Sequence, residues 1–249
     1  MSRLLSSRAF TAAGALLDWF YPPHCYHCGL PLARFRNRML CPECVRHLEK
    51  GRLIGPLCVV CGLPLPGSDG TEECLSCRAL HPPFFRARAF FPYSGPAASI
   101  VRSYKYHGNY FLGPRLMRWV LERHGVPPGV EGYDVLVPVP LHPRRHRERG
   151  YNQSTLLARV LARHSGRPLL PRALRRTRHT DQQALLPRPE RRENVRGAFS
   201  PGPQEVAGKD LLLIDDVMTT GATAGECAAV LRRAGANNVS VLTLVSAGR

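Results

Sequence analysis

The stretch LLLIDDVMTTGATAGE, residues 211–226, decides the fold, because it joins a buried strand to an anion-binding turn and the start of a helix. Its apolar run ends in Asp215 and Asp216, whose carboxylates we expect to stand exposed at the carboxyl edge of a sheet and to accept hydrogen bonds from neighbouring sugar hydroxyls. Gly221 lets the backbone fold closely around an anion, and the next helix aims its N-terminal amides at the same point. Hydroxyl donors come from Thr219, Thr220 and Thr223. The stretch therefore predicts a sugar-phosphate site.

Strand-like and helix-like patterns alternate around this stretch, from Phe84 to the end of the sequence. We expect strands at 84–93, 133–140, 169–174, 209–214 and 238–245, the first at a sheet edge, and helices at 97–106, 112–124, 152–164 and 222–233. A basic loop is expected at 141–150, and an irregular arginine-rich segment, too polar for the core, at 175–199. Alternating strands and helices imply an α/β fold with a mostly parallel sheet flanked by helices.

The N-terminal third contains a duplicated cysteine unit. Eight of the nine cysteines form four C-x-x-C pairs, and adding 33 to the positions of the first four gives the second four. The flanks repeat too, since CYHCGLPL at 25–32 returns as CVVCGLPL at 58–65. The two quartets are Cys25, Cys28, Cys41 and Cys44, followed by Cys58, Cys61, Cys74 and Cys77.

Each quartet supplies four thiolates, which is the ligand set of a structural zinc ion with no position left for water. Disulfides are the alternative, but neighbouring C-x-x-C cysteines make poor structural disulfides and the sequence has no convincing export signal. We therefore expect two structural zinc sites, each formed within one repeat, with an interleaved arrangement of the repeats as the alternative. The ninth cysteine, Cys227, is expected in the core.

These patterns divide the chain into an N-terminal helix at 1–20, a small double zinc ribbon at 21–81 and an α/β domain at 84–249. The apolar run at 9–17 is interrupted by Thr11 and Gly14 and closed by Asp18, whereas a membrane span needs about 20 apolar residues. We therefore expect a cytoplasmic protein with no transmembrane segment, in which any association with a membrane is made through partners.

Positive charge is concentrated in the middle of the chain. The formal net charge is +17 at pH 7, and residues 144–196 hold fifteen arginines against four acidic residues, a net charge of +11. Such a region attracts polyanions, so phosphate-rich small molecules, nucleic acid and anionic lipid headgroups all qualify as partners. A solvated arginine-rich surface is the alternative. Lys105 is expected at a solvent-facing helix end.

Four apolar residues, two acids and a T-T-G-x-T turn resemble the signature of the type I phosphoribosyltransferases. The resemblance implies that Asp215 and Asp216 bind the ribose hydroxyls and that the 5′-phosphate is held by Thr219, Thr220, Gly221, Ala222 and Thr223. It places a pyrophosphate loop after PVPL at 138–141, in which the diphosphate faces Arg144, Arg145, Arg147 and Arg149. It also makes 175–199 a flexible loop that closes over the substrate, with Arg175, Gln182 and Gln183.

The order of motifs along the chain extends this likeness. The double cysteine ribbon is followed by RGYNQ at 149–153, DQQ at 181–183 and IDDVMTTGAT at 214–223. This arrangement resembles the ComF family of phosphoribosyltransferase-like proteins, which are associated with natural DNA uptake beside a helicase-like partner. The resemblance implies an accessory role in competence on the cytoplasmic side, with single-stranded DNA as a partner.

Two classes of function fit these motifs. The first is a glycosyltransferase in which a nitrogenous nucleophile displaces diphosphate from 5-phosphoribosyl 1-diphosphate, with magnesium bridging the diphosphate and ribose oxygens. This chemistry requires positioning and charge stabilisation and no side-chain nucleophile, so no catalytic residue is assigned. The second is a catalytically silent module that binds single-stranded DNA or docks a protein partner. A phosphoribosyltransferase of nucleotide metabolism that acts on a nucleobase or an amine is a further alternative, although no motif identifies the acceptor.

Overall fold

The computed structural model describes residues 23–32, 39–70, 72–180, 187 and 190–248. The helix expected at 1–20 lies outside these residues. Among the described residues, no helix is both long and apolar enough to cross a membrane.

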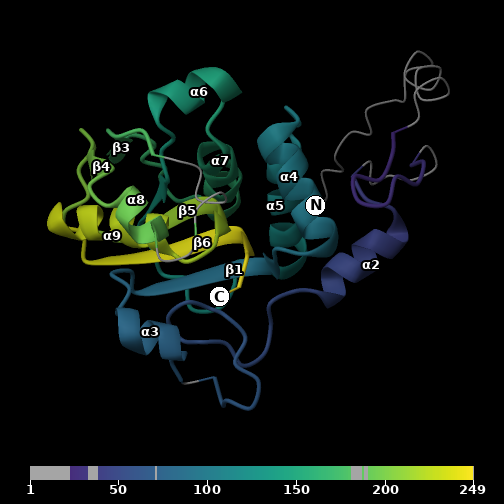
Figure 1. The fold of residues 1–249 in the computed structure, drawn as a ribbon, viewed down its shortest axis with the longest axis horizontal. Helices are drawn as coiled ribbons and strands as arrows, with labels where there is room; N and C mark the ends of the chain where they lie inside the picture. The colour runs from purple at the N-terminus through teal and green to yellow at the C-terminus, as the bar shows by residue number, and fades with distance from the viewer. Residues whose placement is uncertain (1–22, 33–38, 71, 181–186, 188–189, 249) are drawn as a thin grey trace, which may run out of the picture.

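A four-stranded parallel sheet forms the centre of the molecule (Figure 1). Its strands are β1 (Arg86–Pro92), β2 (Val135–Pro138), β5 (Asp210–Met218) and β6 (Asn238–Ser246), in the order β1-β6-β5-β2. All three pairings are parallel, and Leu213 of β5 lies opposite Val137 on one side and Val241 on the other. The predicted parallel sheet is confirmed, with β1 at an edge as expected.

Helices cover both faces of this sheet. The first face carries α4 (Gly95–Tyr106), α5 (Leu112–His124) and α7 (Gln153–Ser165), and the second carries α9 (Ala222–Arg233), the short α8 (Glu190–Val195) and the antiparallel pair β3 (Leu174–Arg176) and β4 (Phe199–Pro201). Successive β5 side chains point to opposite faces, so Leu212 enters the first core and Leu213 the second. Cys227 of α9 is buried in the second core, as predicted.

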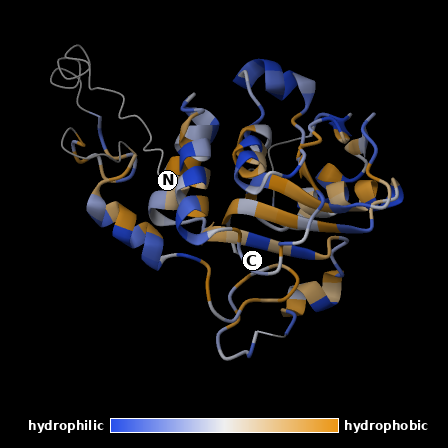
Figure 2. Ribbon diagram, turned by 180° about the vertical axis from the view of Figure 1, so that it is seen from behind, coloured by the Kyte–Doolittle hydropathy of each residue, from blue (hydrophilic) through white to orange (hydrophobic). Residues whose placement is uncertain are grey.

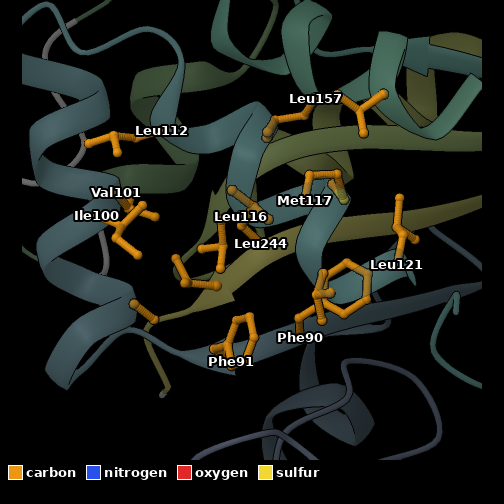
Figure 3. Packing of buried hydrophobic residues seen from close by; sticks show 14 of the residues in the cluster. Phe90, Phe91, Ile100, Val101, Leu112, Leu116, Met117, Leu121, Leu157 and Leu244 are labelled. Carbon is orange, nitrogen blue, oxygen red and sulfur yellow. The ribbon is translucent and has the colours of Figure 1, made fainter. Parts of the chain in front are cut away.

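Burial on both faces explains why the central strands read as continuous apolar runs. Figure 2 shows these strands in orange, in contrast to the blue helix α6 (Pro143–Arg149). In the first core, Leu116 of α5 lies beside Leu244 of β6, with Phe90 and Phe91 of β1 completing the sheet side (Figure 3). The sheet is therefore a rigid platform for residues that follow its carboxyl ends.

The prediction of a basic loop at 141–150 is wrong, because these residues form α6 (Pro143–Arg149). Pro143 occupies the first turn, and the His142 ring accepts a hydrogen bond from the Arg144 N–H at 3.3 Å. Gly150 ends the helix in the left-handed conformation, with φ 79°. Because arginine is also a good helix former, the local signals for this helix are all present in the sequence.

The prediction of a strand at 169–174 is also wrong. Only Leu169 bridges to Leu136 of β2, and the next strand, β3, starts at Leu174 and pairs with β4. Proline at 168 and 171 supplies no N–H for a longer ladder. The segment 175–199, predicted to be irregular and too polar for the core, contains α8 and buries Val195 and Ala198.

The strand that carries the acidic pair is longer than predicted. β5 continues past Ile214 through both acids to Met218 and stays paired with β6, whereas the ladder with β2 ends at Ile214. Beyond Ile214, the side of β5 that faced β2 borders the loop and helices that follow β2, and the candidate site forms there.

The two cysteine repeats fold in the same way. The Cys25 N–H donates to the Leu30 carbonyl, and the equivalent Cys58 N–H donates to the Leu63 carbonyl, both at 2.8 Å. The third cysteine of each repeat immediately precedes a helix, α2 (Pro42–Lys50) or α3 (Leu75–Leu80). The internal repeat in the sequence is therefore a repeat in structure.

The second ribbon packs on the edge strand β1. The Ala87 N–H donates to the Val60 carbonyl at 2.6 Å, and the guanidinium of Arg88, which is 9% exposed, donates to the carbonyls of Cys58 and Val59. The ribbon thus covers a sheet edge that would otherwise present unpaired backbone groups. Gly62 passes so close to β1 that a Cβ on it would lie 2.5 Å from the Ala87 carbonyl oxygen.

The repeat supplies a matched pair of glycines that tests this packing. Gly29 and Gly62 both have left-handed backbones, φ 77° and 70°, but a Cβ on Gly29 would meet nothing within 4 Å. We expect Gly29→Ala to lower the free energy of unfolding by about 1 kcal/mol and Gly62→Ala by about 2–4 kcal/mol, since it adds a clash with β1. Thermal unfolding of the zinc-loaded protein measures both losses. Equal losses would contradict the close approach of the ribbon to the sheet.

Candidate functional site

The cysteines form two separate quartets. The Sγ atoms of Cys25, Cys28, Cys41 and Cys44 lie within 4.8 Å of one another, as do those of Cys58, Cys61, Cys74 and Cys77. The Cys28–Cys41 and Cys61–Cys74 Sγ distances are both 3.7 Å, which matches the edge of about 3.8 Å expected for a tetrahedron of sulfurs around zinc. Pairing within each repeat is confirmed, and each quartet is a zinc site with four cysteine ligands.

Backbone amides prepare one sulfur in each quartet for metal binding. Burial alone would raise the pKa of Cys25, but N–H groups of Cys28, Cys41 and His27 donate to its sulfur and lower the pKa to about 7. The pKa of Cys58 is lowered to about 7 in the same way, against burial, by the amides of its own knuckle and of Cys74. A thiolate is therefore accessible near neutral pH before the zinc ion is counted.

A cavity of about 210 Å³ opens at the carboxyl end of β5. It lies between β5, the last turn of α4, helix α6, the start of α7 and strand β3. Its polar lining consists of Tyr93, Lys105, Tyr106, Arg145, Arg149, Gln153, Ser154, Arg176, Asp215, Asp216, Thr219 and Thr223. Ligands of open α/β sheets bind at this end of the strands, so this cavity is the candidate site.

Both predicted acids line the cavity, but each is already engaged. The Oδ1 atom of Asp216 lies 2.9 Å from the Lys105 ammonium nitrogen. Asp215 Oδ1 accepts hydrogen bonds from the Ser154 hydroxyl at 2.8 Å and from the Asp216 N–H at 2.9 Å. The expectation of exposed carboxylates is corrected, since Asp216 is 5% exposed and Asp215 is half-buried.

Burial and the neighbouring Asp216 carboxylate raise the pKa of Asp215 to about 7. The Lys105 ammonium and the Ser154 hydroxyl act in the opposite direction and favour the charged form. With its pKa raised to about 7, the Asp215 carboxyl group holds a proton at moderately acidic pH.

The prediction of a solvent-facing Lys105 is wrong. Its side chain is 21% exposed and reaches from the last turn of α4 to Asp216. Although burial works against charge, the two carboxylates raise the pKa of Lys105, so it is an ammonium. No local pattern marks this contact, because Lys105 and Asp216 are joined only when α4 packs beside the end of β5.

The four predicted arginines lie on different faces of helix α6. Arg145 and Arg149, four positions apart, line the cavity. Arg144 instead pairs with Glu148 at 3.2 Å, and Arg147 is outside the cavity lining. Only two of the four predicted arginines therefore lie in the cavity with the acidic pair.

The predicted flexible loop contributes a different arginine from the one expected. Arg175 is exposed, whereas the next residue, Arg176, turns into the cavity because side chains alternate along β3. Arg176 donates to the Thr180 hydroxyl, and Arg145 donates to the Thr180 carbonyl at 3.1 Å. Gln182 and Gln183 lie outside the described residues.

The glycine turn after β5 adopts the expected shape. Gly221 has φ 78° and precedes α9, whose first residue is Ala222. Thr219 and Thr223 line the main cavity, and Gly221 and Ala222 line a small hollow that adjoins it. Thr220 faces a different hollow on the α8 side.

Sequence reasoning missed the contribution of α7. Ser154 binds Asp215, and the buried Gln153 amide lines the cavity. A signal was present, because RGYNQS is a polar run that begins a helix: Asn152 caps α7 by accepting from the Ser154 N–H. Behind these residues, the buried Tyr104 hydroxyl donates to the Gln153 carbonyl at 2.9 Å and fixes the start of α7 against α4.

The chain resembles curated proteins along nearly its whole length. It is 34% identical over 228 residues to the DNA utilization protein YhgH of Escherichia coli O157:H7, covering 90% of this chain and 96% of that protein. It is 28% identical over 233 residues to competence protein F of Haemophilus influenzae, covering 92% and 99%. The chain belongs to the ComF family. Competence protein ComFC of Bacillus subtilis matches it at 37% identity over 114 residues, 45% of this chain and 44% of that protein.

Two further comparisons concern parts of this ComF-family chain. A family of double zinc ribbon domains matches residues 16–78. Among solved structures, a glutamine phosphoribosylpyrophosphate amidotransferase from B. subtilis aligns with 52% of the chain and 25% of its own length, at TM-score 0.35 and 24% identity. A purine phosphoribosyltransferase from Pyrococcus horikoshii aligns with 55% of the chain and 72% of its own length, at TM-score 0.32 and 14% identity. Both structures superpose poorly on this chain, so its fold is defined by the sheet topology and strand register described above.

The raised pKa of Asp215 predicts an unusual pH dependence of stability. The folded-state pKa of about 7 exceeds the unfolded value of about 3.9, so stability from this group is full below pH 4 and is lost as pH rises through 7. Asp215→Asn keeps an acceptor for Ser154 but cannot ionise. We expect its free energy of unfolding, relative to that of wild type, to rise by about 2–4 kcal/mol from pH 5 to pH 8. Urea unfolding at both pH values measures this difference.

Asp216→Asn is the control for this experiment. It leaves the Lys105 ammonium without its charged partner, so we expect it to destabilise the protein at pH 8. A constant offset between Asp215→Asn and wild type at the two pH values would show that Asp215 does not titrate in this range.

Proposed function

We propose that the cavity binds 5-phosphoribosyl 1-diphosphate or a closely related sugar phosphate. The observation that carries this proposal is the convergence of two carboxylates, a glycine turn at a helix start and three guanidinium groups on one cavity. Carboxylates suit sugar hydroxyls, and the turn and the guanidinium groups suit phosphate oxygens. A ligand with both kinds of group at its two ends is the natural occupant.

Two buried donors in the cavity support a polar ligand. The Gln153 Nε2 and Arg176 Nε atoms are buried and have no hydrogen-bond partner among the described residues. Buried polar groups in native proteins are almost always paired, so a ligand could satisfy these two donors after a small shift of their side chains toward the cavity that the same residues line. Thr219 and Thr223 add hydroxyls to the lining of the same cavity.

The reaction class that this cavity suits is phosphoribosyl transfer. A nitrogen nucleophile forms a bond to C1 of the ribose while the bond from C1 to the diphosphate oxygen breaks, and the diphosphate leaves with the electron pair. Arg145, Arg149 and Arg176 are placed to stabilise the charge on that leaving group. A catalytically silent protein that only binds the ligand is the alternative, and diphosphate release on addition of nucleobases or amines distinguishes the two.

The biological setting that we propose is DNA uptake and utilisation. The relatives that match this chain are named for DNA utilization and competence, and the match extends over both the ribbon region and the sheet. The cytoplasmic location and the helicase-like partner expected from the family resemblance remain part of this proposal.

The face of α6 makes a matched test of ligand binding. We expect Arg145→Ala to weaken binding of 5-phosphoribosyl 1-diphosphate about 10- to 100-fold, because it removes a charged donor from the cavity. Arg147→Ala, two positions away on the exposed side, should change affinity less than about threefold. The double variant Asp215→Ala with Asp216→Ala should abolish measurable binding in calorimetry. Unchanged binding in Arg145→Ala and the double variant would refute the site.

Single-stranded DNA is a second candidate ligand, favoured by a row of exposed aromatic side chains beside the cavity. Tyr106 lines the cavity mouth, where the Arg149 guanidinium lies 5.9 Å from its ring. Tyr110 and Phe111 are also exposed and lie against each other, and the Tyr26 ring of the first ribbon lies 6.3 Å from that of Phe111. Exposed aromatics interleaved with arginine are the usual surface for unpaired bases.

Tyr110→Ala tests this second ligand. Its ring is 60% exposed, so we expect the substitution to spare stability and to weaken binding of an oligothymidine about 5- to 100-fold. Phe85→Ala is the matched control, since Phe85 is 58% exposed and lies at the start of β1, away from the cavity lining. Fluorescence anisotropy at several salt concentrations measures both. An equal effect of the two substitutions would contradict a DNA path along this row.

A further inference from the structure

The cavity contains more cationic than anionic side chains. Its lining holds two carboxylates, those of Asp215 and Asp216, and four cationic groups, those of Lys105, Arg145, Arg149 and Arg176. Three of the cations are guanidinium groups on α6 and β3, on the side proposed for the diphosphate. The fourth, Lys105, is the one in contact with the acidic pair, 2.9 Å from Asp216.

Lys105 is held in this place by the core. It belongs to α4, whose neighbouring residue Tyr104 is fully buried and bonded to the Gln153 carbonyl at the start of α7. The Tyr151 hydroxyl donates to the Tyr104 carbonyl, which ties the same turn of α4 to the segment before α7. The ammonium is therefore a fixed feature of the cavity and not a surface lysine that happens to fold inward.

The donor set does not fit the magnesium ion that the resemblance to phosphoribosyltransferases implies. Mg²⁺ prefers oxygen ligands in an octahedral arrangement at about 2.0–2.1 Å, keeps several waters, and is usually bound through one or two carboxylates together with substrate phosphates. Here Asp216 Oδ1 is paired with the ammonium and Asp215 Oδ1 accepts two hydrogen bonds, so one oxygen of each carboxylate is already engaged. No other acidic side chain lines the cavity among the described residues, and a dication beside Asp216 would be repelled by Lys105.

We propose that Lys105 supplies the positive charge otherwise expected from magnesium, so that this cavity binds 5-phosphoribosyl 1-diphosphate as the free anion, without a divalent cation. The inference rests on the proposed function and deepens it by defining the form of the ligand. The ammonium lies beside the carboxylates proposed for the ribose hydroxyls, 2.9 Å from Asp216. The guanidinium groups then meet a diphosphate whose full charge is available to them.

The direct test is calorimetric titration of the wild-type protein with 5-phosphoribosyl 1-diphosphate, with and without millimolar MgCl₂. Free divalent cations are removed from the buffers by ion-exchange resin, because a soluble chelator would take zinc from the ribbons. We expect affinity without magnesium to equal or exceed affinity with it, within about threefold. Binding that appears only with magnesium would overturn the inference.

Variants of Lys105 provide the second arm. Lys105→Met keeps the apolar stem and removes the charge, so we expect affinity without magnesium to fall at least about tenfold and added magnesium to restore part of it. Lys105→Arg keeps the charge and should stay independent of magnesium. Zinc content and circular dichroism show whether each variant is folded. A Lys105→Met protein with wild-type affinity and no response to magnesium would contradict the role of the ammonium.

Different results would contradict the proposed function and the inference about magnesium. No binding by wild type under either condition would contradict the proposed function, and the inference with it. Binding that is lost in the Asp215→Ala, Asp216→Ala double variant but always requires magnesium would support the proposed site and refute the inference alone. If Lys105→Met does not fold, the affinities of wild type and Lys105→Arg with and without magnesium still test whether binding requires the metal.

Discussion

The candidate site depends on the point at which two neighbouring strands part. β2 leaves the sheet opposite Ile214, while β5 continues to Met218 in register with β6. The Val139 N–H still donates to the Ile214 carbonyl, so the chain after β2 turns away within one residue of the acidic pair. Much of the cavity lining follows these two strands: α6 and α7 follow β2, and the glycine turn follows β5.

Burial of two adjacent carboxylates next to this divergence imposes the second constraint. Two like charges in a partly buried site are unfavourable unless cations and donors compensate them. Lys105 and Ser154 meet this requirement from α4 and α7, two helices that pack on the same face of the sheet. The compensation explains why the acids face inward and why the cavity keeps an excess of positive charge for an anionic ligand.

The cysteine ribbons are part of the same structure and not a separate appendage. The second ribbon accepts a hydrogen bond from the Ala87 N–H of β1, and Arg88 of β1 donates to carbonyl groups of its first knuckle. Side chains of the first ribbon, such as Leu32 and Leu48, belong to the core that contains α4 and α5. Because α4 carries Lys105, the core shared with the first ribbon also supports the helix that reaches the acidic pair.

The sequence by itself determined the zinc ligands, the parallel sheet and the location of the acidic pair and glycine turn, because these depend on short spacings and on local periodicity. It also held the signals for α6 in Pro143 and Gly150, although an arginine-rich run suggested a loop. Only the tertiary structure decided that Lys105, Ser154 and Arg176 join the acids, that Arg144 and Arg147 do not, and that the carboxylates are buried. The physical reason is that these contacts connect residues far apart in the chain, whose meeting depends on how α4, α7 and β3 pack around one open end of a strand.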